Sequence, residues 1–156
     1  MKVLTFLFIG LLTVFLSFLP TPSSAEPTGL VSMKSAFSVE QTTKRLEGLL
    51  KKRNLNLFAQ VDHTAGAKSV GLKLRPTRLL IFGNPRSGTP LMQCGQSVAI
   101  DLPMKALVWE DEAGQVWVGY NSPNYLKTRH RLKGCDQVLE KTSQALNSLA
   151  KAATQP

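Results

Sequence analysis

The sequence has few of the side chains on which metal and redox sites depend. Its 156 residues include two cysteines, two histidines and ten acidic residues, against nineteen lysines and arginines. Two histidines exclude a multi-histidine zinc site, and the lack of C-x-x-C and C-x-x-C-H spacings argues against a thioredoxin-like centre or covalently attached haem. The sequence therefore predicts no metal site and identifies no cofactor. The alternatives are a mixed metal site with Asp62 or Asp101, and haem ligation by His63, His130, Met92 or Met104.

Only one apolar run is long. Val3 to Leu19 follows Lys2 and precedes Pro20 and the small residues Ser23-Ser24-Ala25, which is the pattern of a secretory signal peptide. We predict cleavage after Ala25, hence a periplasmic or secreted protein. Because the run spans about 17 residues, an uncleaved membrane anchor is the alternative. Residues 26–156 then form a single domain, long enough to bury one sizeable core.

Negative charge is scarce. The formal net charge is +9, and loss of Lys2 with the signal peptide lowers it to +8. Export argues against nucleic acid as the partner and leaves anionic envelope surfaces or acidic proteins. Two basic stretches, 44–53 and 127–133, are equally well explained as solvated faces. The oligomeric state is not determined by the sequence, which is compatible with a homodimer.

The two cysteines, Cys94 and Cys135, form an even pair, which in an oxidising compartment favours one disulfide. The bond closes a loop of about 40 residues and stabilises the fold by about 4 kcal/mol through its constraint on the unfolded chain. Two free thiols, or one thiol paired with another molecule, are the alternatives.

Local patterns predict the first half of the fold. Ser38 and Gln41 form a capping box, and a helix with a buried face follows. Alternation over residues 55–61 predicts a strand that ends at Asp62-His63, and a segment of small residues, 64–71, follows it. The continuous apolar run 79–82 predicts a central strand that ends at Gly83-Asn84-Pro85.

The second half is predicted in the same way. Thr89 before Pro90 predicts the N-cap of a short helix that Gly95 ends, with Cys94 at its last turn. Residues 97–102 and 104–110 predict strands on either side of Pro103. A three-residue turn, 112–114, sets Trp109 opposite Trp117, whereas a four-residue turn would set it opposite Val116.

The end of the chain predicts two helices. A short one runs from Ser122-Pro123 to about Arg131 and is closed by Gly134, and a longer one with an apolar stripe begins at Asp136. Residues 26–29 and 154–156 are expected to fray. The order of elements predicts an α+β fold with helices packed on one face of an antiparallel sheet.

The turn-rich segment Gly83 to Thr89 resembles a phosphate loop superficially. Thr89 stands where a phosphate loop requires lysine, and Pro85 and Pro90 lack backbone donors, so an NTPase is excluded. An anion site made by the loop amides and Arg86 is the functional hypothesis, and a tight structural turn is the alternative.

Asp62-His63 and Asp101 are the other candidates for chemistry. A triad of Ser87, His63 and Asp62 is unsupported, because no G-x-S-x-G elbow is present. Asp101 lies in an apolar stretch, 98–102, where a carboxylate needs a partner, and we expect Arg75 or Arg78 to pair with it.

Three segments carry a resemblance to a known family: AFSVEQTTKRLEGLL (36–50), NLFAQVDHTAGAKSVGL (56–72) and the block from Arg75 to Tyr125. Over about residues 31–152 the chain resembles the bacterial and archaeal domain-of-unknown-function 302 family. The resemblance implies an α+β domain with a TATA-binding-protein-like arrangement and assigns no residue a role. The residues that stand in recurrent family motifs are His63, Arg75, Pro76, Phe82, Gly83, Asn84, Pro85, Gly88, Thr89, Leu91, Met92, Asp101, Leu102 and Pro103.

These observations lead to three hypotheses. The first is a non-catalytic domain that binds a small anionic or apolar ligand in one cleft. The second is an enzyme in which His63 and Asp101 transfer protons, and the third is an envelope adaptor with a basic surface. The residues expected to converge on the cleft are Asp62, His63, Arg75, Asn84, Arg86, Ser87, Thr89 and Asp101.

Overall fold

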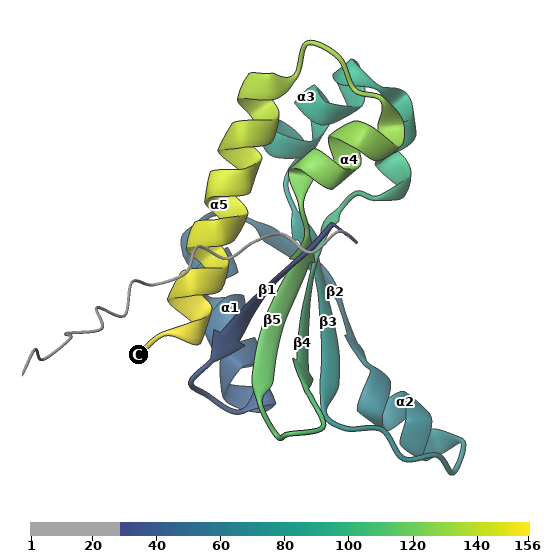
Figure 1. The fold of residues 1–156 in the computed structure, drawn as a ribbon, viewed down its shortest axis with the longest axis vertical. Helices are drawn as coiled ribbons and strands as arrows, with labels where there is room; N and C mark the ends of the chain where they lie inside the picture. Colours follow the sequence, from purple (N-terminus) through teal and green to yellow (C-terminus); the bar gives the residue numbers. More distant parts are fainter. Residues whose placement is uncertain (1–28) are drawn as a thin grey trace, which may run out of the picture.

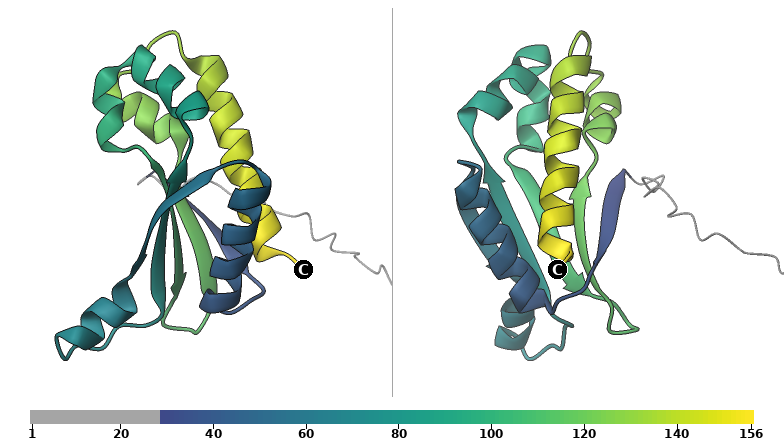
Figure 2. Two further views of the ribbon diagram at one scale, coloured as in Figure 1. Left: turned by 180° about the vertical axis from the view of Figure 1, so that it is seen from behind. Right: turned by 90° about the vertical axis from the view of Figure 1, so that its left-hand side faces the viewer.

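The computed structural model describes residues 29–156, so the predicted signal peptide and its cleavage site lie outside the described residues. Five antiparallel strands form one sheet in the order β1-β5-β4-β3-β2, and helices α1 and α5 lie against one of its faces (Figures 1 and 2). The predicted α+β class is confirmed. The elements are β1 (Leu30–Ser35), α1 (Val39–Lys52), β2 (Asn56–Asp62), α2 (His63–Ser69), β3 (Thr77–Gly83), α3 (Pro85–Cys94), the 3-10 helix η1 (Gln96–Ile100), β4 (Met104–Glu110), β5 (Val116–Asn121), α4 (Pro123–His130) and α5 (Asp136–Thr154).

The capping box predicted for the first helix is confirmed. The Ser38 hydroxyl accepts a hydrogen bond from the Gln41 amide, and the Gln41 side chain accepts one from the Ser38 amide. Leu46 and Leu50 are buried on the face that follows. This face packs against the sheet and against α5, because apolar residues at helical spacing exclude water only together with a second apolar layer.

The buried side chains form two clusters. The first lies between the sheet and helices α1 and α5, around Leu80, Phe82 and Val108. The second lies among α3, η1, α4 and the start of α5, around Leu91, Val98 and Leu139. Figure 1 shows this second group of helices stacked above one end of the sheet.

The β4–β5 hairpin has the predicted register. Asp111 and Gln115 bond to each other across a turn of three residues, and Gly114 takes the left-handed φ of 78° that this turn requires. Trp109 therefore pairs with Trp117, and their ring centroids lie 6.3 Å apart.

The last turn of α5 is fastened to the first half of the chain. The Ala36 amide donates to the Thr154 carbonyl over 3.0 Å, and Arg45 donates to the carbonyls of Ala152, Ala153 and Gln155. Thr154, which was expected to fray, is buried. Gly29 is also buried, against the ring of Tyr125.

Two predictions near α3 are wrong. Asn84, and not Thr89, is the N-cap of α3, because its side chain accepts from the Ser87 amide at 2.9 Å and Pro85 suits the first helical position. Pro90 consequently lies inside the helix. Residues 96–100 form η1 and not a strand. A short apolar run does not distinguish the two, and only Val98 of this run is buried.

Two further predictions are corrected, and one helix was not predicted. The unpredicted helix is α2, residues 63–69, which the Asp62 carboxylate caps by accepting from the Ala65 amide. The left-handed residue that ends α4 is Arg131 and not Gly134. β2 is a strand as predicted, but its alternation does not bury one side, because it is an edge strand whose residues Asn56 to Val61 are all exposed.

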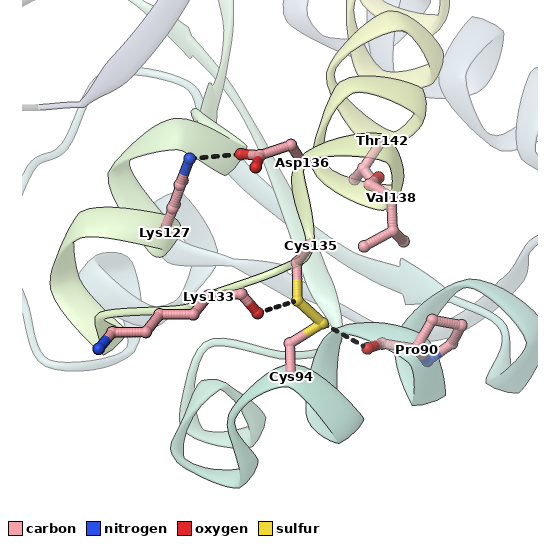
Figure 3. The surroundings of a disulfide bond; sticks show 8 residues. All are labelled: Pro90, Cys94, Lys127, Lys133, Cys135, Asp136, Val138 and Thr142. Atoms are coloured by element: carbon pink, nitrogen blue, oxygen red, sulfur yellow. Dashed lines mark hydrogen bonds and ion pairs between the residues drawn. A yellow bond between two sulfur atoms is a disulfide. The ribbon is translucent and has the colours of Figure 1, made fainter.

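The predicted disulfide between Cys94 and Cys135 is present. It joins the end of α3 to the residue before α5, with the Cα atoms 6.2 Å apart (Figure 3). Beside it, Lys127 of α4 forms an ion pair with Asp136 at the start of α5. These two links hold the three helices of the upper group together.

Candidate functional site

An apolar pocket lies between the first turns of α3, the segment from Ala99 to Met104, and Phe58 of β2. Its volume is about 330 Å³, which falls within the range of small-molecule sites. Most of the residues that stand in the family motifs line it. The side chains that form its apolar wall are Phe58, Leu91, Met92, Leu102, Pro103 and Met104.

A second pocket, of about 600 Å³, adjoins the first between α3 and α5. Its apolar wall is built from Leu55, Phe82 and residues of α5, and three cations stand around it, Arg53, Arg86 and Lys141. We call the two pockets together the α3 cleft. The residues common to both are Gly83, Asn84, Ser87, Met104 and Thr142.

The cations of the α3 cleft differ in their partners. Arg53 donates to the Ala145 and Ser148 carbonyls and to the Ser148 hydroxyl, so it holds the end of α1 against α5. Within residues 29–156, the side chains of Arg86 and Lys141 have no ion-pair or hydrogen-bond partner. Both are exposed and can meet an anion at the cleft.

Asn84 and Ser87 build the edge of the cleft. The Asn84 Oδ1 accepts from the Ser87 amide and hydroxyl at 2.9 and 3.0 Å, and its Nδ2 donates to the Asn54 carbonyl at 3.2 Å. Asn54 itself takes a left-handed φ of 53° after α1. Asn84 therefore ties the start of α3 to the turn before β2, and its role in this structure is to position the cleft.

The predicted site residues do not converge on one surface of the chain. Asn56 pairs with Gly83 and Asp62 pairs with Arg78, so the Asn84 loop and His63 lie at opposite ends of β2. At about 3.3 Å per residue, these ends are separated by about 20 Å. Asn84, Arg86, Ser87 and Thr89 line the α3 cleft, whereas Asp62, His63, Arg75 and Asp101 do not.

Asp62 and Arg75 have other partners. The Asp62 carboxylate caps α2 and lies 3.4 Å from the Arg78 guanidinium. Arg75 lies 3.4 Å from Glu112 in the exposed β4–β5 turn. Both ion pairs are at the end of the sheet away from the cleft.

The expected pairing of Asp101 with Arg75 or Arg78 is wrong. Asp101 precedes Met104, whose partner across the sheet is Phe82, so it lies at the far end of β3 from Arg78. Its Oδ2 instead lies 2.5 Å from His130 Nε2 and 3.4 Å from the Arg129 guanidinium. The pKa of Arg129 is raised, first by its hydrogen bond with the Tyr125 hydroxyl and then by the charge of Asp101.

His130 completes a chain of polar contacts. Its Nδ1 lies 3.1 Å from the Ser97 hydroxyl, and its side chain is only 7% exposed. A hydroxyl, an imidazole and a carboxylate in this order can activate a nucleophile, but none of the three residues lines either pocket of the cleft. The contacts hold α4 against η1. Asp101 and His130 are 29 residues apart, and no local sequence signal links them.

The geometry can be compared with known proteins. A model of the domain of unknown function DUF302 matches residues 31–149. The chain belongs to the DUF302 family. A solved structure, described as an uncharacterized conserved DUF302 protein from Bacillus stearothermophilus, superposes with a TM-score of 0.73 at 19% identity, covering 80% of this chain and 98% of that one. At this identity the likeness shows the fold.

Curated relatives of this DUF302 domain are longer proteins. It is 47% identical over 113 residues to a fluoride-specific ion channel FluC 1 of Brucella suis, a match that covers 72% of this chain and 44% of the relative. The fluoride-specific ion channel FluC 2 of Brucella melitensis matches equally well, over 42% of its length. The chain thus spans less than half the length of these relatives.

Among the helices of residues 29–156, none is both long and apolar enough to cross a membrane. Over the same residues, no three side chains of histidine, cysteine, aspartate or glutamate gather in a way that can hold a metal ion.

Proposed function

We propose that this DUF302 domain is a non-catalytic binding protein for an amphipathic anion, a molecule with an apolar body and an acidic head. The observation that supports this proposal is the α3 cleft, in which an apolar pocket continues into one surrounded by cations. Ligand sites of this kind are mostly apolar, with a few polar groups that fix the orientation of the ligand.

The free energies of apolar burial and of an exposed ion pair show which part of the ligand supplies the affinity. Each buried methylene contributes about 0.8 kcal/mol, so a body of about eight carbons contributes about 6 kcal/mol before the cost of association. An exposed ion pair with Arg86 or Lys141 adds about 0–1 kcal/mol. The apolar body therefore supplies most of the affinity, and the cations select the charge of the head.

A titration tests the proposal. We expect decanoate to bind more tightly than decan-1-ol, and we expect the double variant Arg86→Gln, Lys141→Gln to remove the difference. Lys151→Gln is the matched control, because Lys151 is an exposed lysine of the same helix that lines neither pocket. If neither compound binds, or if the double variant still prefers the carboxylate, the proposal fails.

The alternative of an enzyme that uses His63 and Asp101 has little geometric support, because the two residues lie at opposite ends of the sheet. We therefore place no catalytic step at these residues.

The fluoride-channel relatives favour a second candidate function, that of an accessory domain of an ion channel. A basic, exported adaptor would serve such a role at an anionic envelope surface. The test is co-purification with a fluoride channel produced in the same cells, at low and high salt. Salt-sensitive recovery supports the adaptor, and equal recovery of an unrelated membrane protein contradicts it.

A further inference from the structure

β2 is an unprotected edge of the sheet. It pairs with β3 along one side, and within residues 29–156 no strand lies along its other side. Edge strands present unpaired backbone donors and acceptors, and many carry charged residues or proline that prevent pairing with other chains. The segment from Asn56 to Val61 contains neither, and all of its residues are exposed.

The chain that follows β2 forms an arm that projects from the lower end of the sheet (Figure 1). The arm consists of α2 and residues 70–76, and no side chain of α2 is buried. Its base is nevertheless fixed, because the Thr64 hydroxyl donates to the Arg75 carbonyl at 3.1 Å and accepts from the Thr77 amide at 2.9 Å. The arm is therefore attached firmly at its base, but no other part of residues 29–156 buries the side chains of α2.

The exposed apolar residues gather on these two elements. Of the seven large apolar side chains that are exposed within residues 29–156, six are on β2 and the arm, with 38% to 69% of their surface exposed. We call them the β2–arm surface. They are Leu57, Phe58, Val61, Val70, Leu72 and Leu74.

The area of this surface suits a protein partner. Six large side chains at these exposures present several hundred square ångströms, on the order of the roughly 800 Å² that each partner buries in a stable interface.

We propose that a second copy of this chain covers the β2–arm surface, with the two β2 strands paired antiparallel about a two-fold axis near Ala59. Because residues 56–61 carry no charge, pairing this segment with its own copy places no like charges opposite each other. A two-fold interface uses the same surface on both copies, so assembly stops at the dimer and does not continue into a fibre. The two sheets join into one continuous sheet.

This register sets where the second copy's arm lies. A two-fold axis near Ala59 places Val61 of the second copy beside Leu57, and Asp62 of the second copy beside Asn56. The second copy's arm therefore begins beside Leu55, next to the turn between α1 and β2, and the apolar side chains Leu57 and Val61 of the two strands cover each other.

The pairing also adds to the edge of the α3 cleft. Phe58 is one wall of its apolar pocket, and Gln60 of the second copy lies beside it. The same arrangement brings His63 of the second copy towards the turn at Asn54, whose carbonyl binds Asn84.

Analytical ultracentrifugation of the protein, purified from cells that express the full sequence, tests the surface. We expect a dimer, and we expect Val61→Lys to raise its dissociation constant at least about tenfold. The matched control is Ile100→Lys, because Ile100 is 74% exposed and lies outside the surface. Circular dichroism melts of both variants establish that the fold is kept.

Cross-linking tests the two-fold axis. We expect Ala59→Cys to form a covalent dimer on mild oxidation, and Ile100→Cys to remain uncross-linked. A protein that is monomeric at every concentration overturns the proposal, as does a dimer that neither Val61→Lys weakens nor Ala59→Cys cross-links. A monomer that binds anionic lipid vesicles through Val70 and Leu72 also overturns it, because the arm then docks on a membrane.

Discussion

One carboxylate fixes the β4–β5 turn. The Asp111 side chain accepts hydrogen bonds from the Trp117 indole at 2.7 Å and from the Gln115 and Ala113 amides at 2.9 Å. These bonds lower the pKa of Asp111 below its ordinary value, and the bond from Trp117 is the largest cause. A lowered pKa in the folded state means that the stabilisation is present above the ordinary aspartate pKa and is lost as the pH falls through the lowered one.

We therefore expect a change in tryptophan fluorescence at a pH below the ordinary pKa of aspartate, as the bond to Trp117 weakens. Asp111→Asn should remove this transition and lower the melting temperature, because an amide nitrogen cannot accept from the indole. Glu112→Gln is the control, since Glu112 is exposed in the same turn. A transition that persists in Asp111→Asn would assign it to another group.

A substitution at Gly88 can change ligand binding without destabilising the fold. A Cβ atom at this position would meet only the Leu102 side chain, at 3.9 Å, which is an ordinary contact. Gly88 lies inside α3 and lines the apolar pocket, and glycine costs a helix interior about 1 kcal/mol relative to alanine.

We expect Gly88→Leu to fill the pocket, so that decanoate binding is lost while the melting temperature is unchanged or higher. Gly48→Leu is the matched control, because Gly48 lies in α1 with open space around it and away from the cleft. Calorimetric titration and thermal denaturation measure the two effects. Full decanoate affinity in Gly88→Leu would show that the ligand does not occupy this pocket.

At the scale of elements, the disulfide links the two helices that form the α3 cleft. It joins residues 41 apart and stabilises by about 4 kcal/mol in the chain-entropy account. We expect reductant to lower the melting temperature of the native protein and to leave that of Cys94→Ser, Cys135→Ser unchanged. Ligand affinity should fall in the double variant, because α3 loses its attachment to α5. Equal thiol titres before and after reduction would show that the bond does not form.

The sequence correctly predicts two local features, a helix cap and a turn, that depend only on residues close together in the chain. The capping box at Ser38 and the three-residue turn that sets Trp109 opposite Trp117 both depend on contacts a few residues apart. Asn84 and Thr89 are both acceptable caps before a proline, and the structure uses Asn84, whose side chain accepts from the Ser87 amide.

The candidate site was predictable only in part. The segment from Asn84 to Thr89 does line a cleft, but Phe58 joins it through the pairing of β2 with β3, which alternation alone does not set. His63 and the Asn84 loop lie at opposite ends of β2. Both segments contain turn residues, and turn residues alone do not show which strand ends lie at the same edge of a sheet. The contact of Asp101 with His130 depends on the packing of α4, which is a tertiary property.

The whole molecule is predicted to be exported after cleavage of its N-terminal segment. The Ser23-Ser24-Ala25 site predicts that the extracytoplasmic protein begins at Glu26. N-terminal sequencing of protein recovered from that fraction measures this directly. Recovery of an intact N-terminus in the membrane fraction would instead support the anchor.

The attachment of Thr154 to Ala36 has a consequence for how the protein is made. β1 and the last turn of α5 complete one core, so the segment near residue 36 lacks its partner until residue 154 has been synthesised. Contacts between residues so far apart in the sequence form late in folding, because bringing the two segments together costs the conformational entropy of the long chain between them. The core around β1 therefore closes only when the last turn of α5 packs against it, and truncation before Thr154 should leave the segment near Ala36 without its partner.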